Sequence, residues 1–315
     1  MKALITGLAG FIGFHAARRF SFEGYHVAGF DNFNGYYDQR LKRMRASILR
    51  DECNIECKPL DLRHKDGVKQ LILREKPQLV VHLGAMAGVR HSMDNPQSYI
   101  DNNITGSMNL ILACEEAGVQ DVIFASTSCV MHGNPLPWTE SAVFHHQINP
   151  YGYTKCINES QFAISKIPNA VGLRLFTAYG PWGRPDTAIF GFTKNILEGQ
   201  PIALFNHGRM KRDFTYVDDV VEAIWLVSQN ITAREIYNVG YGKQVELEHL
   251  VAVLESAVGK NAIRRYVPQH PADVTETWSD SSKLANLGFR PKVSIETGAE
   301  RFVGWYSEYC GRVAG

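Results

Sequence analysis

Two tyrosines precede a lysine in the segment NPYGYTK, which spans residues 149–155. If a helix begins after Pro150, Tyr151 and Lys155 are four residues apart and share one helix face, whereas Tyr153 points away from it. An ammonium group beside a phenol lowers the pKa of the phenol from about 10 toward neutrality, which suits it for proton transfer. We therefore expect Tyr151 to act as a general base with Lys155 as its partner; the alternative is a stacked pair of surface side chains.

A row of polar side chains, STSC at residues 126–129, follows the apolar stretch VIFA. Short apolar stretches are typical of buried strands, so these polar groups lie where a strand ends and can face a ligand. Thr127 or Ser128 would hold a substrate hydroxyl, and we place Thr127 beside Tyr151 in the catalytic group. Cys129 is a weaker hydrogen-bond donor than a hydroxyl would be.

A glycine-rich turn, TGLAGFIG, places Gly7, Gly10 and Gly13 between the strand-like KALIT and the helical FIGFHAARRF. Glycines allow a tight turn and let backbone N–H groups at a helix N-terminus approach a pyrophosphate. Asp31 follows the next apolar stretch, where a carboxylate accepts hydrogen bonds from ribose hydroxyls and would repel a 2′-phosphate. This pattern predicts a site for NAD rather than NADP; the alternative is a plain turn and a surface aspartate.

Further strand ends fit the same dinucleotide. Asp61 and Leu62 would lie beside the adenine, and the small residues of HLGAMAG would let the ligand cross the sheet. Asn103 would brace neighbouring strand ends through its amide, with a buried amide that only satisfies loop backbone as the alternative. The residues that we expect at the cofactor are Gly7, Gly10, Phe11, Ile12, Gly13, Asp31, Asn32, Asp61, Leu62, Leu83, Ala85, Ala87, Asn103, Tyr151 and Lys155.

The elements that must position these residues alternate along the chain. Short apolar stretches alternate with helical segments, including a long helix after Pro96, up to about residue 174. This alternation predicts an α/β fold with a doubly wound parallel Rossmann sheet. Loops rich in Gly, Pro and aromatic residues follow. We expect an NAD-binding domain at residues 1–173, with a returning segment around 213–240, and a smaller C-terminal substrate-binding α/β domain at residues 174–315.

Composition excludes several classes of protein. The chain has 315 residues, 45% of them apolar, with 33 basic and 32 acidic side chains, so the charge balance argues against nucleic acid or an anionic membrane as partner. Met1 and Lys2 lead directly into the first apolar stretch, and no apolar run reaches the ~18 residues of a membrane span, so we expect a cytoplasmic protein. Six cysteines without a C-x-x-C pair predict neither a disulfide framework nor a metal site.

Together, the glycine turn, Asp31, STS and Tyr151-x-x-x-Lys155 resemble the extended short-chain dehydrogenase/reductase family, in its NAD-dependent epimerase/dehydratase group. Within that group, AMAGVRHSMDNP, RLFTAYGPWGRPD and GRMKRDFTYVDDVVEAI are similar to the UDP-glucuronate 4-epimerases of bacterial surface-polysaccharide pathways. The resemblance covers the whole chain, and its loop motifs agree in order and spacing.

The resemblance implies a hydride shuttle. Tyr151 would take the proton of the sugar 4-hydroxyl while C4 gives its hydride to NAD; the 4-keto sugar then turns over, and the hydride returns to the opposite face. Arg212 would contact the UDP diphosphate, and Arg184 would pair with the sugar carboxylate, unless it is a structural arginine of its Pro/Gly loop. The expected substrate residues are Arg90, Thr127, Ser128, Cys129, Thr177, Arg184 and Arg212. Relatives commonly pair through two long helices, which implies a homodimer.

Other functions remain open at the level of sequence. Related dehydratases and UDP-xylose-forming decarboxylases carry a glutamate where this chain has Cys129, so both chemistries are disfavoured. A 4-epimerase of a neutral UDP-hexose or UDP-N-acetylhexosamine is the nearest alternative, and only Arg184 with its threonine-rich surroundings argues against it. A non-catalytic NAD-sensing regulator would not be expected to keep Tyr151 and Lys155.

Overall fold

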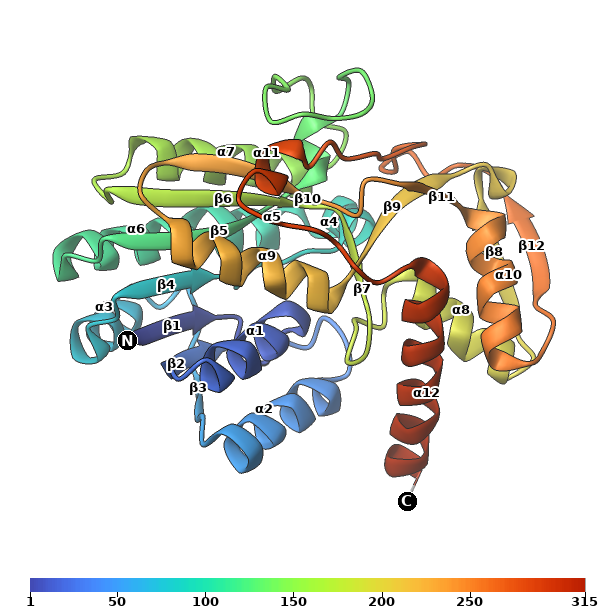
Figure 1. Ribbon diagram of the computed structural model, residues 1–315, viewed down its shortest axis with the longest axis horizontal. Coiled ribbons are helices and arrows are strands. Elements are labelled where there is room, and N and C mark those ends of the chain that lie inside the picture. The colour runs from blue at the N-terminus through green and yellow to red at the C-terminus, as the bar shows by residue number, and fades with distance from the viewer. Residues whose placement is uncertain (315) are drawn as a thin grey trace.

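The computed structural model describes residues 1–314, and a seven-stranded sheet forms its centre (Figure 1). Every neighbouring pair of strands in this sheet is parallel. The strand order is β10-β6-β5-β4-β1-β2-β3. The strands are β1 (Lys2–Thr6), β2 (His26–Asp31), β3 (Cys57–Pro59), β4 (Leu79–His82), β5 (Asp121–Thr127), β6 (Asn169–Leu175) and β10 (Glu235–Val239). The predicted doubly wound parallel α/β fold is confirmed.

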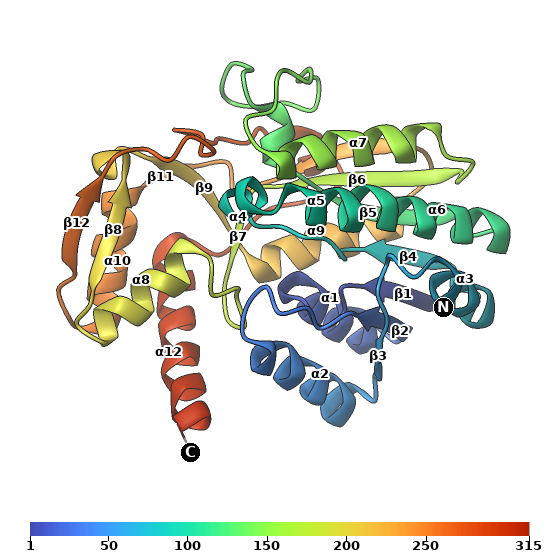
Figure 2. The ribbon, with the colours of Figure 1, turned by 180° about the vertical axis from the view of Figure 1, so that it is seen from behind.

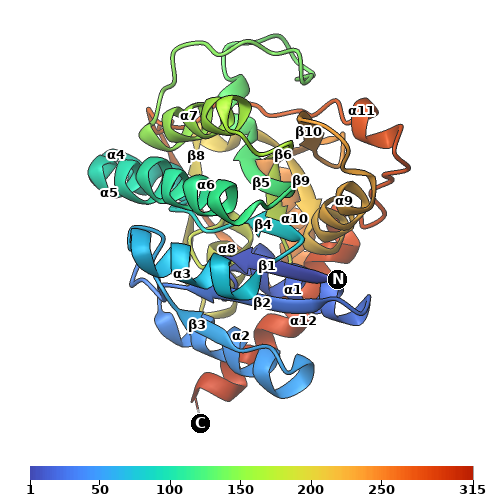
Figure 3. The ribbon, with the colours of Figure 1, turned by 90° about the vertical axis from the view of Figure 1, so that its left-hand side faces the viewer.

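Helices cover both faces of the sheet, as the buried, apolar central strands require (Figure 3). One face carries α1 (Phe11–Phe22), α2 (Gln39–Cys53) and α9 (Val217–Asn230). The other face carries α3 (Lys65–Glu75), α6 (Gly106–Ala117) and α7 (Pro150–Ile164). Each face has its own apolar core: Phe14 and Ile224 belong to the first, and Leu71 and Phe162 to the second.

The prediction of a single long helix after Pro96 is wrong. The chain instead forms α4 (Val89–Asp94), α5 (Pro96–Tyr99), a π-helical stretch η1 (Ile100–Thr105) and then α6. Asn102 and Asn103 are both buried within η1. A π-helical turn inserts an extra residue per turn and is frequent at functional sites. Here it directs the amide of Asn103 to the backbone of Met86.

A second group of elements lies beyond the carboxyl ends of the large sheet (Figure 2). It contains a three-stranded sheet, β7 (Thr177–Tyr179), β9 (Lys211–Tyr216) and β11 (Gln244–Glu246), and a parallel pair, β8 (Pro201–Phe205) and β12 (Ile263–Val267). Its helices are α8 (Ala188–Leu197), α10 (Leu247–Val258) and α12 (Ile295–Ala314), whereas α11 (Ser282–Ala285) packs against β10 of the large sheet. Between β9 and β11 the chain returns through α9 and β10 to the large sheet.

The remaining short elements are the 3-10 turns η2 (Ser128–Met131) and η3 (Asn206–Gly208). Among residues 1–314, no helix is both long and apolar enough to cross a membrane. The same described residues contain no group of three or more His, Cys, Asp or Glu side chains placed to hold a metal ion.

Candidate active site

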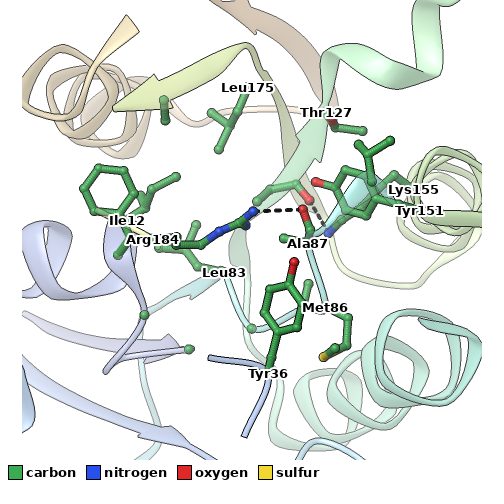
Figure 4. A pocket seen from close by; sticks show the side chains of 18 of the residues that line it. Ile12, Tyr36, Leu83, Met86, Ala87, Thr127, Tyr151, Lys155, Leu175 and Arg184 are labelled. Carbon is green, nitrogen blue, oxygen red and sulfur yellow. Dashed lines mark hydrogen bonds between the residues drawn. The ribbon is translucent and has the colours of Figure 1, made fainter. Parts of the chain in front are cut away.

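A cavity of about 400 Å³ runs across the carboxyl ends of the strands, between the large sheet and the second group of elements (Figure 4). The glycine turn and the end of β2 form one end of it, the ends of β4 and β5 form its floor, and β7 and β9 contribute to the other end. The predicted residues that line it are Gly7, Gly10, Phe11, Ile12, Gly13, Asp31, Asn32, Leu62, Leu83, Ala85, Ala87, Thr127, Ser128, Cys129, Tyr151, Lys155, Thr177, Arg184 and Arg212.

The glycine turn is closely packed and leaves no room for side chains. A Cβ at Gly13 would lie 2.1 Å from the carbonyl oxygen of Gly7, and a Cβ at Gly10 would lie 2.8 Å from the same atom. Gly7 itself has a φ of 68°, a conformation that L side chains rarely adopt. No side chain caps the N-terminus of α1. Its first backbone N–H groups therefore remain available for an anionic ligand.

Asp31 closes this end of the cavity. Its carboxylate accepts a hydrogen bond from the backbone N–H of Phe33 (2.8 Å), and the ammonium of Lys42 lies 3.8 Å away. Burial raises the pKa of Asp31, and the charge of Lys42 opposes that rise. The acidic group thus lies at the end of β2, where the spacing from the glycine turn predicted it. Lys42 also lines the cavity, although its position on α2 gave no signal in the sequence.

Two predicted cofactor residues do not line the cavity. Asp61 is turned toward Asn32 (2.9 Å) and Arg63 (2.9 Å); although burial raises its pKa, the hydrogen bonds from Arg63 hold that pKa at about 2. Asn103 is fully buried and bonds the Met86 N–H (2.8 Å) and carbonyl (3.0 Å). It braces the loop after β4 and does not line the cavity, so the prediction that Asn103 contacts the cofactor is wrong.

The neighbouring Asn102 lines the cavity instead. The π-helical stretch decides which of the two adjacent asparagines faces the ligand site, and residue spacing carries no signal for it.

Helix α7 positions the tyrosine and lysine. Asn149 caps it, accepting a hydrogen bond from the backbone N–H of Gly152 (2.8 Å), so the helix begins at Pro150. Tyr151 and Lys155 both line the cavity, whereas Tyr153 is 51% exposed. The ammonium of Lys155 donates a hydrogen bond to the carbonyl oxygen of Ala125 (2.8 Å). The lysine therefore ties α7 to the end of β5.

The expected lowering of the Tyr151 pKa does not occur in this structure. Burial raises that pKa to about 12 and is reinforced by Cys129; the hydrogen bond with Thr127 and the charge of Arg184 oppose it. Burial also lowers the pKa of Lys155 to about 8. Desolvation is the largest cause of both shifts because both side chains lie inside the protein.

The polar row at the end of β5 faces Tyr151. Thr127 accepts a hydrogen bond from the backbone N–H of Cys129 (3.3 Å), which fixes the turn into η2. Burial raises the pKa of the Cys129 thiol, so this side chain is neutral where a carboxylate would be charged. Behind the row, the buried ion pair of Glu159 and Arg174 (2.9 Å) joins α7 to β6. Residue spacing alone carries no signal for this pair.

The three predicted substrate arginines differ in placement. Arg212 lines the cavity and donates to the carbonyl oxygens of Val274 (2.6 Å) and Thr275 (3.0 Å). Arg184 also lines it, beside Thr177. Arg90 does not.

Arg90 lies outside the cavity because α4 directs it outward. Its side chain is 44% exposed, pairs with Asp273 (2.7 Å) and lies 3.6 Å above the ring of Phe205. The prediction that it lines the substrate site is wrong. Asp273 itself lines the cavity, together with Val274 and Thr277, in a segment that the sequence did not single out.

Comparison with known proteins agrees with this geometry. The model of the NAD dependent epimerase/dehydratase family matches residues 3–240. A UDP-glucuronate 4-epimerase from Thermodesulfobacterium geofontis is 38% identical, over 97% of this chain and 96% of that protein. The crystal structure of UDP-glucuronic acid 4-epimerase from Bacillus cereus, in complex with UDP-glucuronic acid and NAD, is 32% identical over 98% of this chain and all of that one, with a TM-score of 0.92.

A 4-epimerase named for a neutral sugar nucleotide, UDP-glucose, is also similar in structure. The UDP-glucose 4-epimerase from Thermus thermophilus, in complex with NAD, is 28% identical over 98% of this chain and 99% of that one, with a TM-score of 0.88. The chain studied here belongs to the NAD dependent epimerase/dehydratase family.

Proposed function

We propose that this protein is an NAD-dependent 4-epimerase that interconverts UDP-glucuronate and UDP-galacturonate. The observation that carries the proposal is that one cavity is lined by the glycine turn, by Tyr151 and by Arg184 and Arg212. The name of the 38% identical relative and the ligands of the Bacillus cereus structure support the same substrate and cofactor.

The residues at the glycine end fit NAD. The turn at Gly7, Gly10 and Gly13 has no space for a Cβ but offers backbone N–H groups to a pyrophosphate, and Asp31 offers a carboxylate to ribose hydroxyls. When bound, NAD supplies the reversible two-electron oxidation of an alcohol carbon. Because an epimerase uses the cofactor in both directions within one turnover, no second redox substrate is needed.

The protein's own groups then move the proton and hold the sugar. Tyr151 takes the proton of the sugar 4-hydroxyl and gives it back after the 4-keto sugar has turned over. Thr127, which lines the same cavity as Tyr151, orients that hydroxyl. Lys155 holds α7 against β5 through Ala125 and, when charged, favours the phenolate.

At the other end, charge and hydroxyl groups suit an anionic nucleotide sugar. Arg212, Arg184, Thr177 and Ser128 all line the cavity; Arg212 would bind the diphosphate, and the other three would bind the sugar carboxylate. At position 129, where related decarboxylases and dehydratases carry a glutamate, this cavity has the neutral thiol of Cys129. This favours return of the keto sugar as an epimer over decarboxylation or dehydration.

A neutral UDP-hexose is the second candidate substrate, because the guanidinium of Arg184 already pairs with Asp186 (2.7 Å). Incubation of the purified protein with UDP-glucuronate, followed by chromatographic separation, tests the choice. UDP-galacturonate is the expected product. Turnover of UDP-glucose or UDP-N-acetylglucosamine alone would support the neutral sugar, and UDP-pentose as the main product would support a decarboxylase.

The proposal extends to organisation and assembly. Residues 1–173 with the segment around 213–240 would bind NAD, and residues 174–315 mainly the UDP-sugar. A homodimer would form through α6 and α7, whose Leu112 and Tyr153 expose 43% and 51% of their surface. Size-exclusion chromatography tests this, and elution at monomer mass would contradict it. We also propose a cytoplasmic role in polysaccharide biosynthesis, as the sequence resemblance implies.

A further inference from the structure

The loop that carries Arg184 is held in place by three contacts from the large-sheet region. His15 bonds the carbonyl oxygen of Pro181 (2.9 Å), and the buried Arg45 donates to the carbonyl oxygens of Trp182 and Gly183. These bonds fix the backbone before Arg184 independently of its side chain. The third contact lies beyond Arg184, at Asp186.

Asp186 holds one edge of the Arg184 guanidinium. Its two carboxylate oxygens accept from Nε (3.0 Å) and Nη2 (2.7 Å) of Arg184, and Nη2 also donates to the carbonyl oxygen of Ala87 (3.2 Å). Within residues 1–314, Nη1 has no recorded hydrogen-bond partner. Because a guanidinium is planar and rigid, two parallel bonds on one edge fix the direction of the other.

Tyr36, in the segment that follows β2, holds Asp186. Its hydroxyl donates to the carboxylate of Asp186 (2.9 Å), and its ring packs at 4.6 Å against His91. Burial raises the pKa of Asp186, but the charge of Arg184 together with the hydrogen bonds from Arg184 and Tyr36 lowers it by more, so the group stays ionised. Figure 4 shows Tyr36 and Arg184 directed toward the same part of the cavity as Tyr151. Tyr36 and Arg184 line this cavity, whereas Asp186 does not.

We propose that Asp186, held by Tyr36, is a positioning residue that sets the plane and the effective charge of Arg184 toward the sugar carboxylate. This inference rests on the proposed function. Asp186 weakens the attraction of Arg184 for an anion, because it competes for the same guanidinium. In exchange it holds the free edge of the guanidinium in one orientation, so affinity is lowered while geometry is fixed.

Fixed geometry matters because the 4-keto uronate is a β-keto acid. Loss of carbon dioxide breaks the C5–C6 bond, whose electron pair becomes the C4–C5 π-bond of an enolate with the charge on O4, and C5 later takes a proton. This step requires the C5–C6 bond to align with the carbonyl π-orbitals. A carboxylate held by a guanidinium of fixed orientation resists that alignment, whereas a guanidinium freed from Asp186 does not.

The test compares Asp186→Asn with the wild-type protein and measures two quantities. Calorimetry with UDP-glucuronate and UDP-glucose gives an affinity ratio, and product analysis gives the UDP-pentose formed per UDP-galacturonate. We expect the ratio to shift about fivefold toward UDP-glucuronate. We also expect the UDP-pentose fraction to rise severalfold. Tyr36→Phe removes only the hydroxyl and should change both quantities in the same direction by less.

Asp38→Asn is the matched control, since Asp38 follows Tyr36 closely in the chain but pairs with the exposed Arg40. It should leave both quantities unchanged. An equal loss of affinity for the two nucleotides in Asp186→Asn would indicate a merely structural role and overturn the inference, as would an unchanged ratio. Absence of UDP-galacturonate from the wild-type reaction would instead overturn the proposed function, while the affinity ratio would still decide the role of Asp186.

Discussion

The two ends of the cavity are built in different ways. At the glycine end the ligand would meet backbone, in a turn of seven consecutive residues, Gly7 to Gly13, plus a carboxylate at the end of the next strand. At the sugar end it would meet arginine side chains that already have protein partners: carbonyl oxygens for Arg212 and Asp186 for Arg184. Ligand binding at the glycine end therefore depends on the absence of side chains. Binding at the sugar end depends on how the two arginines divide their hydrogen bonds between protein groups and the ligand.

The largest effect should come from the group between the two ends. Tyr151→Phe removes the proton carrier, and we expect epimerisation to fall by roughly 10²- to 10⁴-fold. Binding of UDP and NAD, measured by calorimetry, should stay within a few-fold of wild type. The control is Tyr153→Phe, which alters an exposed side chain. Equal losses in the two variants would contradict the assignment of Tyr151.

At the glycine end, adding a single methyl group should be enough to reduce NAD binding. In Gly13→Ala the new methyl group would lie 2.1 Å from the carbonyl oxygen of Gly7, so the turn must deform. We expect unfolding free energy to fall by roughly 1–3 kcal/mol and NAD affinity to drop as well. Chemical denaturation and cofactor titration measure these. Gly191→Ala, in α8 with nothing within 4 Å of its Cβ, should leave NAD affinity unchanged. A wild-type affinity in Gly13→Ala would refute the close-packing argument.

Lys155 ties α7 to the end of β5, and the burial of its ammonium group lowers the stability of the folded protein. The folded protein lowers the lysine pKa to about 8, so folding disfavours the ammonium form. Lys155→Met should therefore raise the unfolding free energy at pH 7 by about 1–3 kcal/mol while turnover is lost. The advantage should shrink as pH rises from about 8 to about 10.4, because the wild-type lysine becomes neutral in both states. Denaturation at several pH values would detect the opposite slope, which would contradict this account.

The smallest effect should come from the arginine outside the cavity. Arg90 pairs with Asp273 at an exposed position, and such ion pairs contribute about 0–1 kcal/mol. Arg90→Ala should therefore change the affinity for UDP-glucuronate by less than about fivefold. Arg184→Ala should weaken UDP-glucuronate far more than UDP-glucose. A loss in Arg90→Ala as large as that in Arg184→Ala would mean that the sugar end extends to the rim.

The two ends also differ in how far they could be predicted. The glycine turn, Asp31 and the spacing of Tyr151 and Lys155 are local patterns, so the parallel sheet and the placement of these groups at its carboxyl edge follow from the order of elements. The errors occurred where contacts span long separations in the chain. Arg90 and Asp273 are 183 residues apart, and Asn103 is turned away from the cavity by a π-helical stretch.

The alternation of strands and helices, the glycine turn and the helix face shared by Tyr151 and Lys155 could be predicted from the amino-acid sequence, because they depend on residue type and short spacing. Tertiary structure decided the pKa values of that pair, since burial raises one and lowers the other, and no spacing rule reports burial. It also brought the Tyr36 hydroxyl to the carboxylate of Asp186, which in turn pairs with Arg184 at the cavity. Arg184 and Asp186 are only two residues apart, but Tyr36 lies 150 residues from Asp186 in the chain and reaches it only after folding, so no local motif reports this contact.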